Sequence, residues 1–325
     1  MSTSFDAIVV GAGPGGCAAA IVCRQHGLST LLLEADSTPR DRPGETLSPE
    51  VAGILDRLGV REAFDRARFF TNTGHRVTRG SASVFQEYGA LGYQARRSEL
   101  DAILIAGARA AGADVRQGTA ASEPLVEDGR TVGVRTRGAV LRARFTIDAA
   151  GPGHWMQRHL GLALLQISDP LIARFGWTEG AGDGPKFEMR GCGWRWEAPV
   201  AADRRAWVSL ELDGKLERPG PPGRDVTWRM ARPCAGAGYF LVGEAACVLD
   251  PACSNGVTRA LLSGMRAGDA IARGESAVAY GAWMESWFCS DALTLATLYS
   301  NFEPPPEWLD RACEALRYMA MRPLL

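Results

Sequence analysis

Glycines near the N-terminus form the first pattern that can bind a ligand. The turn Gly11-Ala-Gly13-Pro-Gly15-Gly16 follows the short apolar run Asp6–Val10 and opens a stretch of small residues. In a GxGxxG turn the first glycine permits the tight bend, the second lets backbone amides approach a diphosphate, and the third lets helix and strand pack closely. A helix that begins there presents its N-terminal amides to phosphate. The spacing therefore predicts a strand, turn and helix that bind a dinucleotide.

An acidic residue stands where the same unit needs one. Ser29–Glu34 has the pattern of the next strand, and Glu34 closes it, 23 residues after Gly11. A carboxylate there accepts hydrogen bonds from a ribose hydroxyl and disfavours a 2′-phosphate. We therefore assign to cofactor binding Gly11, Gly13, Pro14, Gly15, Gly16, Glu34 and Ala35.

A second segment separates the possible dinucleotides. Leu241–Gly256 reads LVGEAACVLDPACSNG, and Asn255–Ile271 after it is predicted to be a helix. The segment resembles the GDAA…DPxxSxG motif of the superfamily of FAD-dependent monooxygenases and flavin-dependent halogenases. In that family the acid after the glycine holds the ribityl or ribose part of FAD, and amides of the turn face the flavin, where they stabilise negative charge on its reduced form. The resemblance implies FAD contacts at Gly243, Glu244, Asp250, Asn255, Gly256 and Val257, and catalytic positions at Pro251 and Ser254.

Glu244 departs from the family, which usually has Asp at this position. The extra methylene implies looser retention of FAD.

Three further pieces of the family pattern occur in order. Pro43–Pro49 (PGETLSP) resembles the GE-S/T-x-x-P loop along the flavin, Arg97 matches an arginine that contacts the FAD phosphates, and Asp148–Gly151 resembles a DATG strand end. The likeness covers residues 6 to about 270 and adds as FAD ligands Glu45, Thr46, Arg97 and Gly151.

The order of elements predicts how these residues meet. Strand and helix patterns alternate up to the strand Val140–Asp148, with a helix at Ser98–Gly112. Residues 153–232 then change character, with six of the nine tryptophans and short alternating runs, before Tyr239–Val242 returns to a buried strand. We predict an α/β fold of the aromatic-hydroxylase type. It has a Rossmann-like FAD-binding domain (1–74, 98–152 and 233–275), an inserted antiparallel-sheet substrate domain (75–97 and 153–232) and a helical C-terminal segment (276–325) interrupted at Pro304–Pro306.

Two tryptophans and the lysine content bear on the chemistry. Gly193–Pro199 (GWRWEAP) resembles the WxWxIP motif of flavin-dependent halogenases, and indoles two residues apart on a strand point the same way. Trp194 and Trp196 are therefore predicted to wall the route to the substrate, although plain core packing stays an alternative. A halogenase also needs a lysine between the GE loop and the Arg97 helix, where this sequence has none. Its only lysines are Lys186 and Lys215, and arginine does not deprotonate in its place.

The closer resemblance is to halogenase-like flavoproteins that oxygenate peptidyl tryptophan during maturation of cysteine tryptophylquinone. It is carried by RPGETLSPEVAGILDRLG, by GCGW before Ala198-Pro199, and by LDPxxSxG followed by ALLSG. It implies an FAD-dependent monooxygenase that hydroxylates an electron-rich aromatic substrate through a flavin C4a-hydroperoxide, with O₂ as co-substrate. The substrate would be a small natural-product intermediate or a peptide- or carrier-borne tryptophan. Since no second GxGxxG exists, electrons would come from a visiting NAD(P)H or from a partner flavin reductase.

Alternatives remain open at this point. They are a flavin-dependent halogenase, a reductase of the geranylgeranyl type, and a non-catalytic flavin-binding protein. His75 lies before Arg97 on an expected strand and has the pKa range of a general base, although a surface histidine is the plainer interpretation.

Composition narrows the remaining classes. A net charge of −1 gives no general attraction to nucleic acid or anionic membrane, and no apolar run reaches the length of a membrane span. The N-terminus lacks a signal-peptide pattern. The eight cysteines form no CxxC pair, so we expect reduced thiols, no metal site and a cytoplasmic location.

Overall fold

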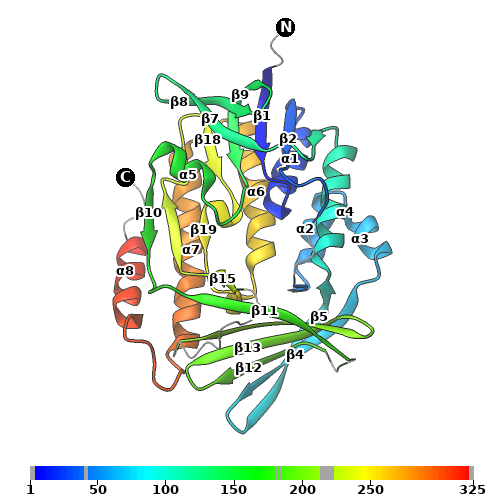
Figure 1. Ribbon diagram of the computed structural model, residues 1–325, viewed down its shortest axis with the longest axis vertical. Helices are drawn as coiled ribbons and strands as arrows, with labels where there is room; N and C mark the ends of the chain where they lie inside the picture. The colour runs from blue at the N-terminus through cyan, green and yellow to red at the C-terminus, as the bar shows by residue number, and fades with distance from the viewer. Residues whose placement is uncertain (1–3, 40–42, 181, 183, 213–222, 322–325) are drawn as a thin grey trace.

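The computed structural model describes residues 4–39, 43–180, 182, 184–212 and 223–321 (Figure 1). Its first layer is an eight-stranded sheet with the order β17-β18-β9-β1-β2-β6, which β7 and β8 extend through β9. β1 (Ser4–Val10) runs parallel to β2 (Thr30–Leu33) on one side and to β9 (Val140–Asp148) on the other. β2 and the last four residues of β1 are fully buried, in keeping with their continuous apolar sequences, whereas β9 is buried mainly towards its end at Asp148. The other strands are β6 (Asp114–Arg116), β7 (Ala121–Glu127), β8 (Arg130–Thr136), β17 (Ala235–Gly236) and β18 (Tyr239–Leu241).

The chain leaves this sheet and returns to it, as the sequence predicted. β18 lies parallel to β9, although the whole inserted segment separates the two strands in sequence. α1 (Pro14–Gln25) and α6 (Gly256–Arg273) pack in close contact, because α6 turns glycines toward α1. A Cβ built on Gly264 would lie 2.0 Å from the carbonyl oxygen of Gly15. α4 (Arg97–Ala110) also packs on α1, and the Rossmann-like part of the predicted fold is confirmed.

A second eight-stranded sheet lies across the bottom of the molecule in Figure 1, below the first sheet and its helices. Its order is β15-β11-β14-β13-β12-β4-β5-β3, antiparallel throughout except that β12 runs parallel to β4. Its strands are β3 (Glu45–Leu47), β4 (Phe70–Arg79), β5 (Ala82–Ala95), β11 (Ile172–Glu179), β12 (Lys186–Arg190), β13 (Gly193–Ala201), β14 (Arg204–Glu211) and β15 (Gly223–Asp225).

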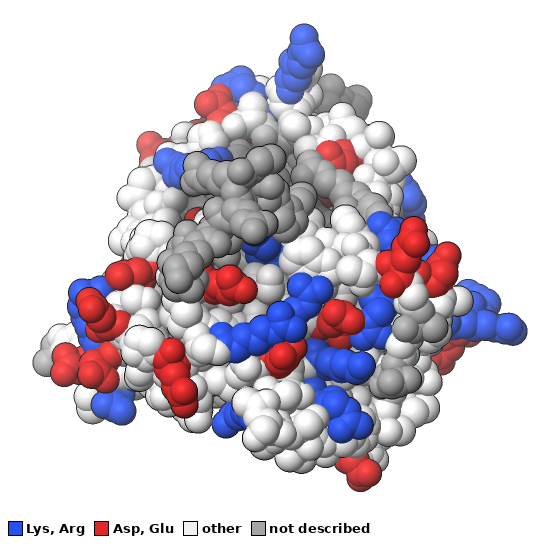
Figure 2. Space-filling view, turned by 60° about the horizontal axis from the view of Figure 1, so that its bottom comes forward, with Lys and Arg blue, Asp and Glu red and all other residues white. Residues whose placement is uncertain are grey.

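Two segments join this sheet earlier in the chain than the sequence indicated. β4 begins at Phe70, and β3 pairs with β5 through Glu45–Ala95 and Leu47–Tyr93, whereas our division gave residues 1–74 to the other unit. The β4–β5 hairpin is long but rich in Thr, Gly and charged residues, so its alternation is weak. Figure 2 shows basic and acidic side chains interspersed over the lower face of the molecule, with no extended field of one sign.

Smaller elements connect the two layers. A three-stranded sheet joins β10 (Ala163–Gln166), β16 (Arg229–Arg232) and β19 (Cys247–Val248), next to the short helix α5 (Trp155–Leu160). α2 (Val51–Arg57) and α3 (Arg61–Arg66) lie between β3 and β4. The tail forms α7 (Ala277–Tyr299) and α8 (Leu309–Met321), which flank the prolines at 304–306 as predicted. Among the described helices, none is long and apolar enough to cross a membrane.

Candidate flavin site

The fingerprint turn has the shape that its glycines predict. Gly11 has a φ of +101°, and a Cβ there would lie 2.3 Å from the carbonyl oxygen of Ala149. A Cβ on Gly16 would lie 1.8 Å from the carbonyl oxygen of Gly11, so neither position tolerates a side chain. Gly13 differs, since a Cβ there would meet nothing within 4 Å. Its open side, beside the first turn of α1, is the cradle that a diphosphate can enter.

Glu34 lies at the rim of this turn. Its Oε2 accepts a hydrogen bond from the backbone N–H of Ala12 at 2.7 Å, and its Oε1 accepts one from the N–H of Asp36 at 3.0 Å. The two backbone donors fix the carboxylate at the end of β2, with Ala35 next to it. Each carboxylate oxygen keeps capacity to accept a ribose hydroxyl.

Arg97 joins the GE loop to α4. Its Nη1 lies 2.8 Å from a carboxylate oxygen of Glu45, and its Nη2 lies 3.4 Å from Asp101. Burial acts to lower the pKa of Arg97, but the carboxylates of Asp101, Glu45 and Glu244 outweigh it and raise the pKa above its ordinary value. The Nε of this buried guanidinium has no hydrogen-bond partner. The open side of Gly13 fits a dinucleotide phosphate, and so does the unsatisfied Nε of Arg97 at the start of α4, the helix that packs on α1. The residues present therefore fit FAD.

The two late turns differ in what they offer. Gly243 has a φ of +55° and donates its N–H to Ser263 Oγ. The side chain of Glu244, next to it, is 41% exposed and forms an ion pair with Arg224. Asp250 is instead 1% exposed. It accepts from the N–H of Ala252 at 2.7 Å, from the indole of Trp194 at 3.0 Å and from the hydroxyl of Tyr299.

Asp250 therefore stabilises the DPxxSxG turn from the inside. Desolvation raises its pKa to about 6, against the hydrogen bonds that lower it. The hydrogen bonds that Asp250 makes are to the protein itself, and its assignment to FAD stays a prediction. Ser254 follows with a φ of +57°, and α6 begins at Gly256 after Asn255, with Val257 buried. Pro251 begins the 3₁₀ turn Pro251–Cys253.

Asp148 has a similar internal role in the DAAG strand end. It accepts from the N–H groups of Ala150 and Met156, and desolvation raises its pKa to about 6. Gly151, which the resemblance assigns to FAD, follows in the left-handed region with a φ of +83°.

The two indoles of β13 each donate a hydrogen bond to a different loop. Trp194 is 1% exposed, stacks on Phe187 and binds Asp250, so its ring lies in the core rather than along an open route. Trp196 is half-buried and donates its N–H to Thr46 Oγ1 at 3.1 Å. Each indole thus supports one of the two loops that the resemblance assigns to FAD. A direct contact of Trp194 with substrate has no support in this geometry.

A chain of hydrogen bonds continues from Trp196 along the second sheet. The Thr46 hydroxyl donates to Gln94, the Gln94 amide donates to Asn72, and the Asn72 amide donates to the carbonyl of Gly74, at 2.8, 2.8 and 3.0 Å. The chain ends at a β-bulge between Asn72 and Gly74. Sequence reasoning missed Gln94, Asn72 and Tyr299, since each acts through partners distant in sequence and belongs to no local motif.

His75 follows this bulge on β4. Its ring lies 5.4 Å from that of Tyr88, and desolvation lowers its pKa. Its Nδ1 is buried without a partner. The imidazole is therefore neutral near pH 7, as a base would be, and its catalytic role remains a prediction.

Lys186 does not face the indole pair. On β12 it lies opposite Glu197 in the register with β13 and opposite Arg76 in the register with β4. Glu197 is adjacent to Trp196 on β13 and so points to the opposite face of the sheet. Lys215 lies outside the described residues.

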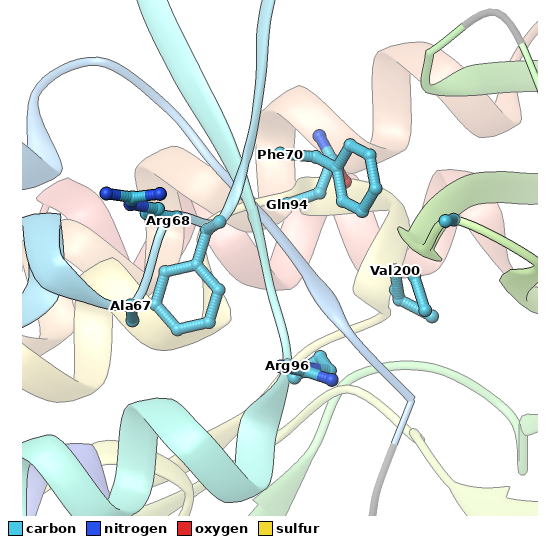
Figure 3. Close-up of a pocket in the computed structure, with 9 residues that line it drawn as sticks. Ala67, Arg68, Phe70, Gln94, Arg96 and Val200 are labelled. Carbon is cyan, nitrogen blue, oxygen red and sulfur yellow. The ribbon is translucent and has the colours of Figure 1, made fainter.

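A small pocket of about 210 Å³ lies behind the GE loop (Figure 3). It is bounded by the start of β4, the end of β5 and the β13–β14 turn, and Figure 3 shows Gln94 and Phe70 together, with Ala67 and Val200 on opposite sides. A Cβ on Gly44 would lie 2.4 Å from Val200, so the pocket wall touches the loop. No residue that we assign to FAD lines this pocket.

A GxGxxG turn, a buried arginine on the helix that packs against α1, and a second sheet inserted before the DPxxSxG turn define a flavoprotein of the FAD-dependent monooxygenase and halogenase type. The chain belongs to the FAD binding domain family, whose model matches residues 4–205. Its relatives include 1H-pyrrole-2-carbonyl-[peptidyl-carrier protein] brominase of Pseudoalteromonas luteoviolacea, 28% identical over 82% of this chain and 77% of that protein. Another is digeranylgeranylglycerophospholipid reductase of Methanosphaerula palustris, 28% identical over 88% of this chain and 82% of that protein.

Solved structures share the fold. The flavin-dependent brominase Bmp2 superposes with a TM-score of 0.83 at 21% identity, covering 98% of this chain and 90% of that one. The peptidyl tryptophan dihydroxylase QhpG gives 0.75 at 21% identity, covering 95% and 79%. The predicted fold class and the predicted superfamily are therefore confirmed, and the chain is an FAD-dependent oxidoreductase of the halogenase-like group.

Proposed function

We propose that this protein is an FAD-dependent monooxygenase that hydroxylates an electron-rich aromatic ring. The observation that carries the proposal is the missing lysine. The segment between the GE loop and Arg97 has His75, Arg76 and Arg79 on β4 but no lysine, and Lys186 points away from the indole pair. A halogenase of the resembled type uses a lysine in that segment, and arginine stays protonated there.

The residues around the cofactor have separate tasks. The backbone of the fingerprint, together with Arg97, binds the diphosphate, and Glu34 binds a ribose. Bound, reduced FAD supplies the activation of O₂. Amides of the DPxxSxG turn would stabilise negative charge on the reduced cofactor, and Trp194 and Trp196 fix the two loops that the resemblance assigns to it. The second sheet excludes water and positions the substrate, and His75 accepts a proton from an aromatic N–H or O–H.

The substrate class follows from the same proposal. We propose a small natural-product intermediate or a tryptophan borne by a peptide or a carrier, with a fold shared by a peptidyl tryptophan dihydroxylase in support. Electrons come from NAD(P)H or from a partner flavin reductase, and the reaction takes place in the cytoplasm, where the free cysteines stay reduced.

Halogenation is the second candidate, because a brominase and a tryptophan 2-halogenase are among the relatives. One experiment separates the two. Protein with reduced FAD, O₂ and bromide is given indole, phenol and pyrrole as probes, and products are analysed by mass spectrometry. Hydroxylated product without bromination supports the proposal. Enzyme-dependent bromination that survives removal of free hypohalite overturns it and directs attention to Lys215.

A further inference from the structure

An ion pair joins the second sheet to the late turn at Glu244, the position where this chain departs from its family. The carboxylate of Glu244, next to Gly243, pairs with the guanidinium of Arg224 on β15. Both side chains are partly exposed, at 41% and 35%. The extra methylene of glutamate extends the carboxylate toward this partner, which belongs to the second sheet and to no flavin motif.

A second connection positions the same two segments. Asp225, next to Arg224, accepts from the guanidinium of Arg229 at 3.0 Å, and the Nε of Arg229 donates to Nε2 of His154 at 2.9 Å. The other ring nitrogen of His154 lies 3.1 Å from the carbonyl oxygen of Ala245, which follows Glu244. The contacts form a closed ring, so Arg224 occupies a defined place beside the Gly243–Ala245 turn.

That turn adjoins the first turn of α1, which follows the fingerprint glycines. Val242, which leads into it, lies 3.3 Å from the position of a Cβ on Gly15 in the fingerprint. A Cβ on Gly243 would lie 3.2 Å from Ala260 of α6, the helix that packs on α1. The charge of Glu244 also acts on Arg97, whose Nε is unsatisfied. Glu244 therefore pairs directly with one guanidinium, that of Arg224, and interacts electrostatically with a second, that of Arg97, at a turn that adjoins the fingerprint segment.

We propose that Glu244 and the FAD diphosphate compete for Arg224. Without cofactor the guanidinium is neutralised by Glu244, and binding of FAD transfers it to the phosphates. FAD must therefore break an ion pair on entry and is released more readily than it would be from an aspartate at this position. A site of this kind suits a flavin that exchanges between proteins, rather than one that stays bound through many turnovers.

A double-mutant cycle on FAD affinity tests the competition. FAD is titrated into wild type, Glu244→Asp, Arg224→Ala and the double variant, with quenching of flavin fluorescence as the readout. Glu244→Asp retracts the carboxylate and should tighten binding about fivefold, the scale of a partly exposed ion pair. Arg224→Ala loses a charge-assisted phosphate contact and should weaken binding about tenfold. In the Arg224→Ala background, Glu244→Asp should change affinity less than about twofold.

Further ligands and variants make the outcome specific. ADP affinity should fall with Arg224→Ala, while riboflavin, which lacks phosphate, should bind as it does to wild type. Arg224→Gln and the thermal midpoint of each variant separate a local effect from misfolding. Arg142→Ala, which breaks an exposed ion pair with Glu127, is the matched control and should leave FAD affinity unchanged. The proposal is overturned if Glu244→Asp tightens binding equally without Arg224, or if Arg224→Ala binds FAD as wild type does. Neither result depends on the reaction catalysed.

Discussion

Replacing Trp194 with Phe tests the link between the second sheet and the DPxxSxG turn. The indole is 1% exposed and donates to Asp250, a carboxylate without solvent. Loss of a hydrogen bond to a charged group costs about 1.5–3 kcal/mol, and the smaller ring adds about 1 kcal/mol of lost packing. We therefore expect the free energy of unfolding to fall by about 3 kcal/mol. At about 2 °C per kcal/mol for a chain of this size, the thermal midpoint should fall by about 6 °C.

Chemical denaturation followed by circular dichroism gives the free energy, with Trp196→Phe and Trp207→Phe in parallel. Trp196 donates to the neutral Thr46 hydroxyl, so its loss should cost about 1 kcal/mol. The half-buried ring of Trp207 lies beneath the Arg195 guanidinium. Trp207→Phe should therefore lower the free energy of unfolding by no more than Trp196→Phe does. The peroxide-to-product ratio is measured on the same samples. A cost below about 1 kcal/mol for Trp194→Phe would refute the role of the Asp250 bond. If stability falls while the peroxide-to-product ratio stays constant, both indoles contribute to packing alone and not to the reaction.

Three further variants test other parts of the site. Gly13→Ala should leave the thermal midpoint unchanged, because its Cβ meets no neighbour, yet weaken FAD at least about tenfold by obstructing the cradle; normal FAD affinity would contradict this. Gly16→Ala should destabilise the protein by about 3 kcal/mol in a denaturation assay, since its Cβ would lie 1.8 Å from a backbone oxygen, and a stable variant would show that the turn is misassigned. For His154, burial lowers the pKa below its ordinary 6.5, so the unfolded chain binds more protons as the pH falls past 6.5 and the free energy of unfolding decreases. His154→Gln should remove that part of the pH dependence. If the free energies of unfolding of wild type and variant differ by the same amount at every pH, protonation of His154 is not the cause.

Local spacing predicted most of the fold because its signals are short-range. The GxGxxG turn, Glu34 and the strand Val140–Asp148 each follow from neighbouring residues, and the return to the first sheet follows from the apolar run at residue 239. The β4–β5 hairpin was only partly recognised, because its polar alternation differs little from that of a loop.

The site was less predictable where partners are far apart in the chain. Asp250 was assigned to FAD by its motif, but its partners Trp194 and Tyr299 lie 56 and 49 residues away and give no periodic signal. The same holds for Glu244, whose departure from the family was visible while its partner Arg224 was not. Burial of both aromatic donors depends on how the sheet and α7 pack, which one sequence does not specify.

The fate of molecular oxygen tests the proposed function most directly. The protein is loaded with reduced FAD and given indole or phenol under ¹⁸O₂ with excess bromide. The molecular mass of the product is then measured by mass spectrometry. The proposal predicts one ¹⁸O atom on the aromatic ring and no effect of bromide. A brominated ring, or reduction of a substrate without consumption of O₂, would contradict it.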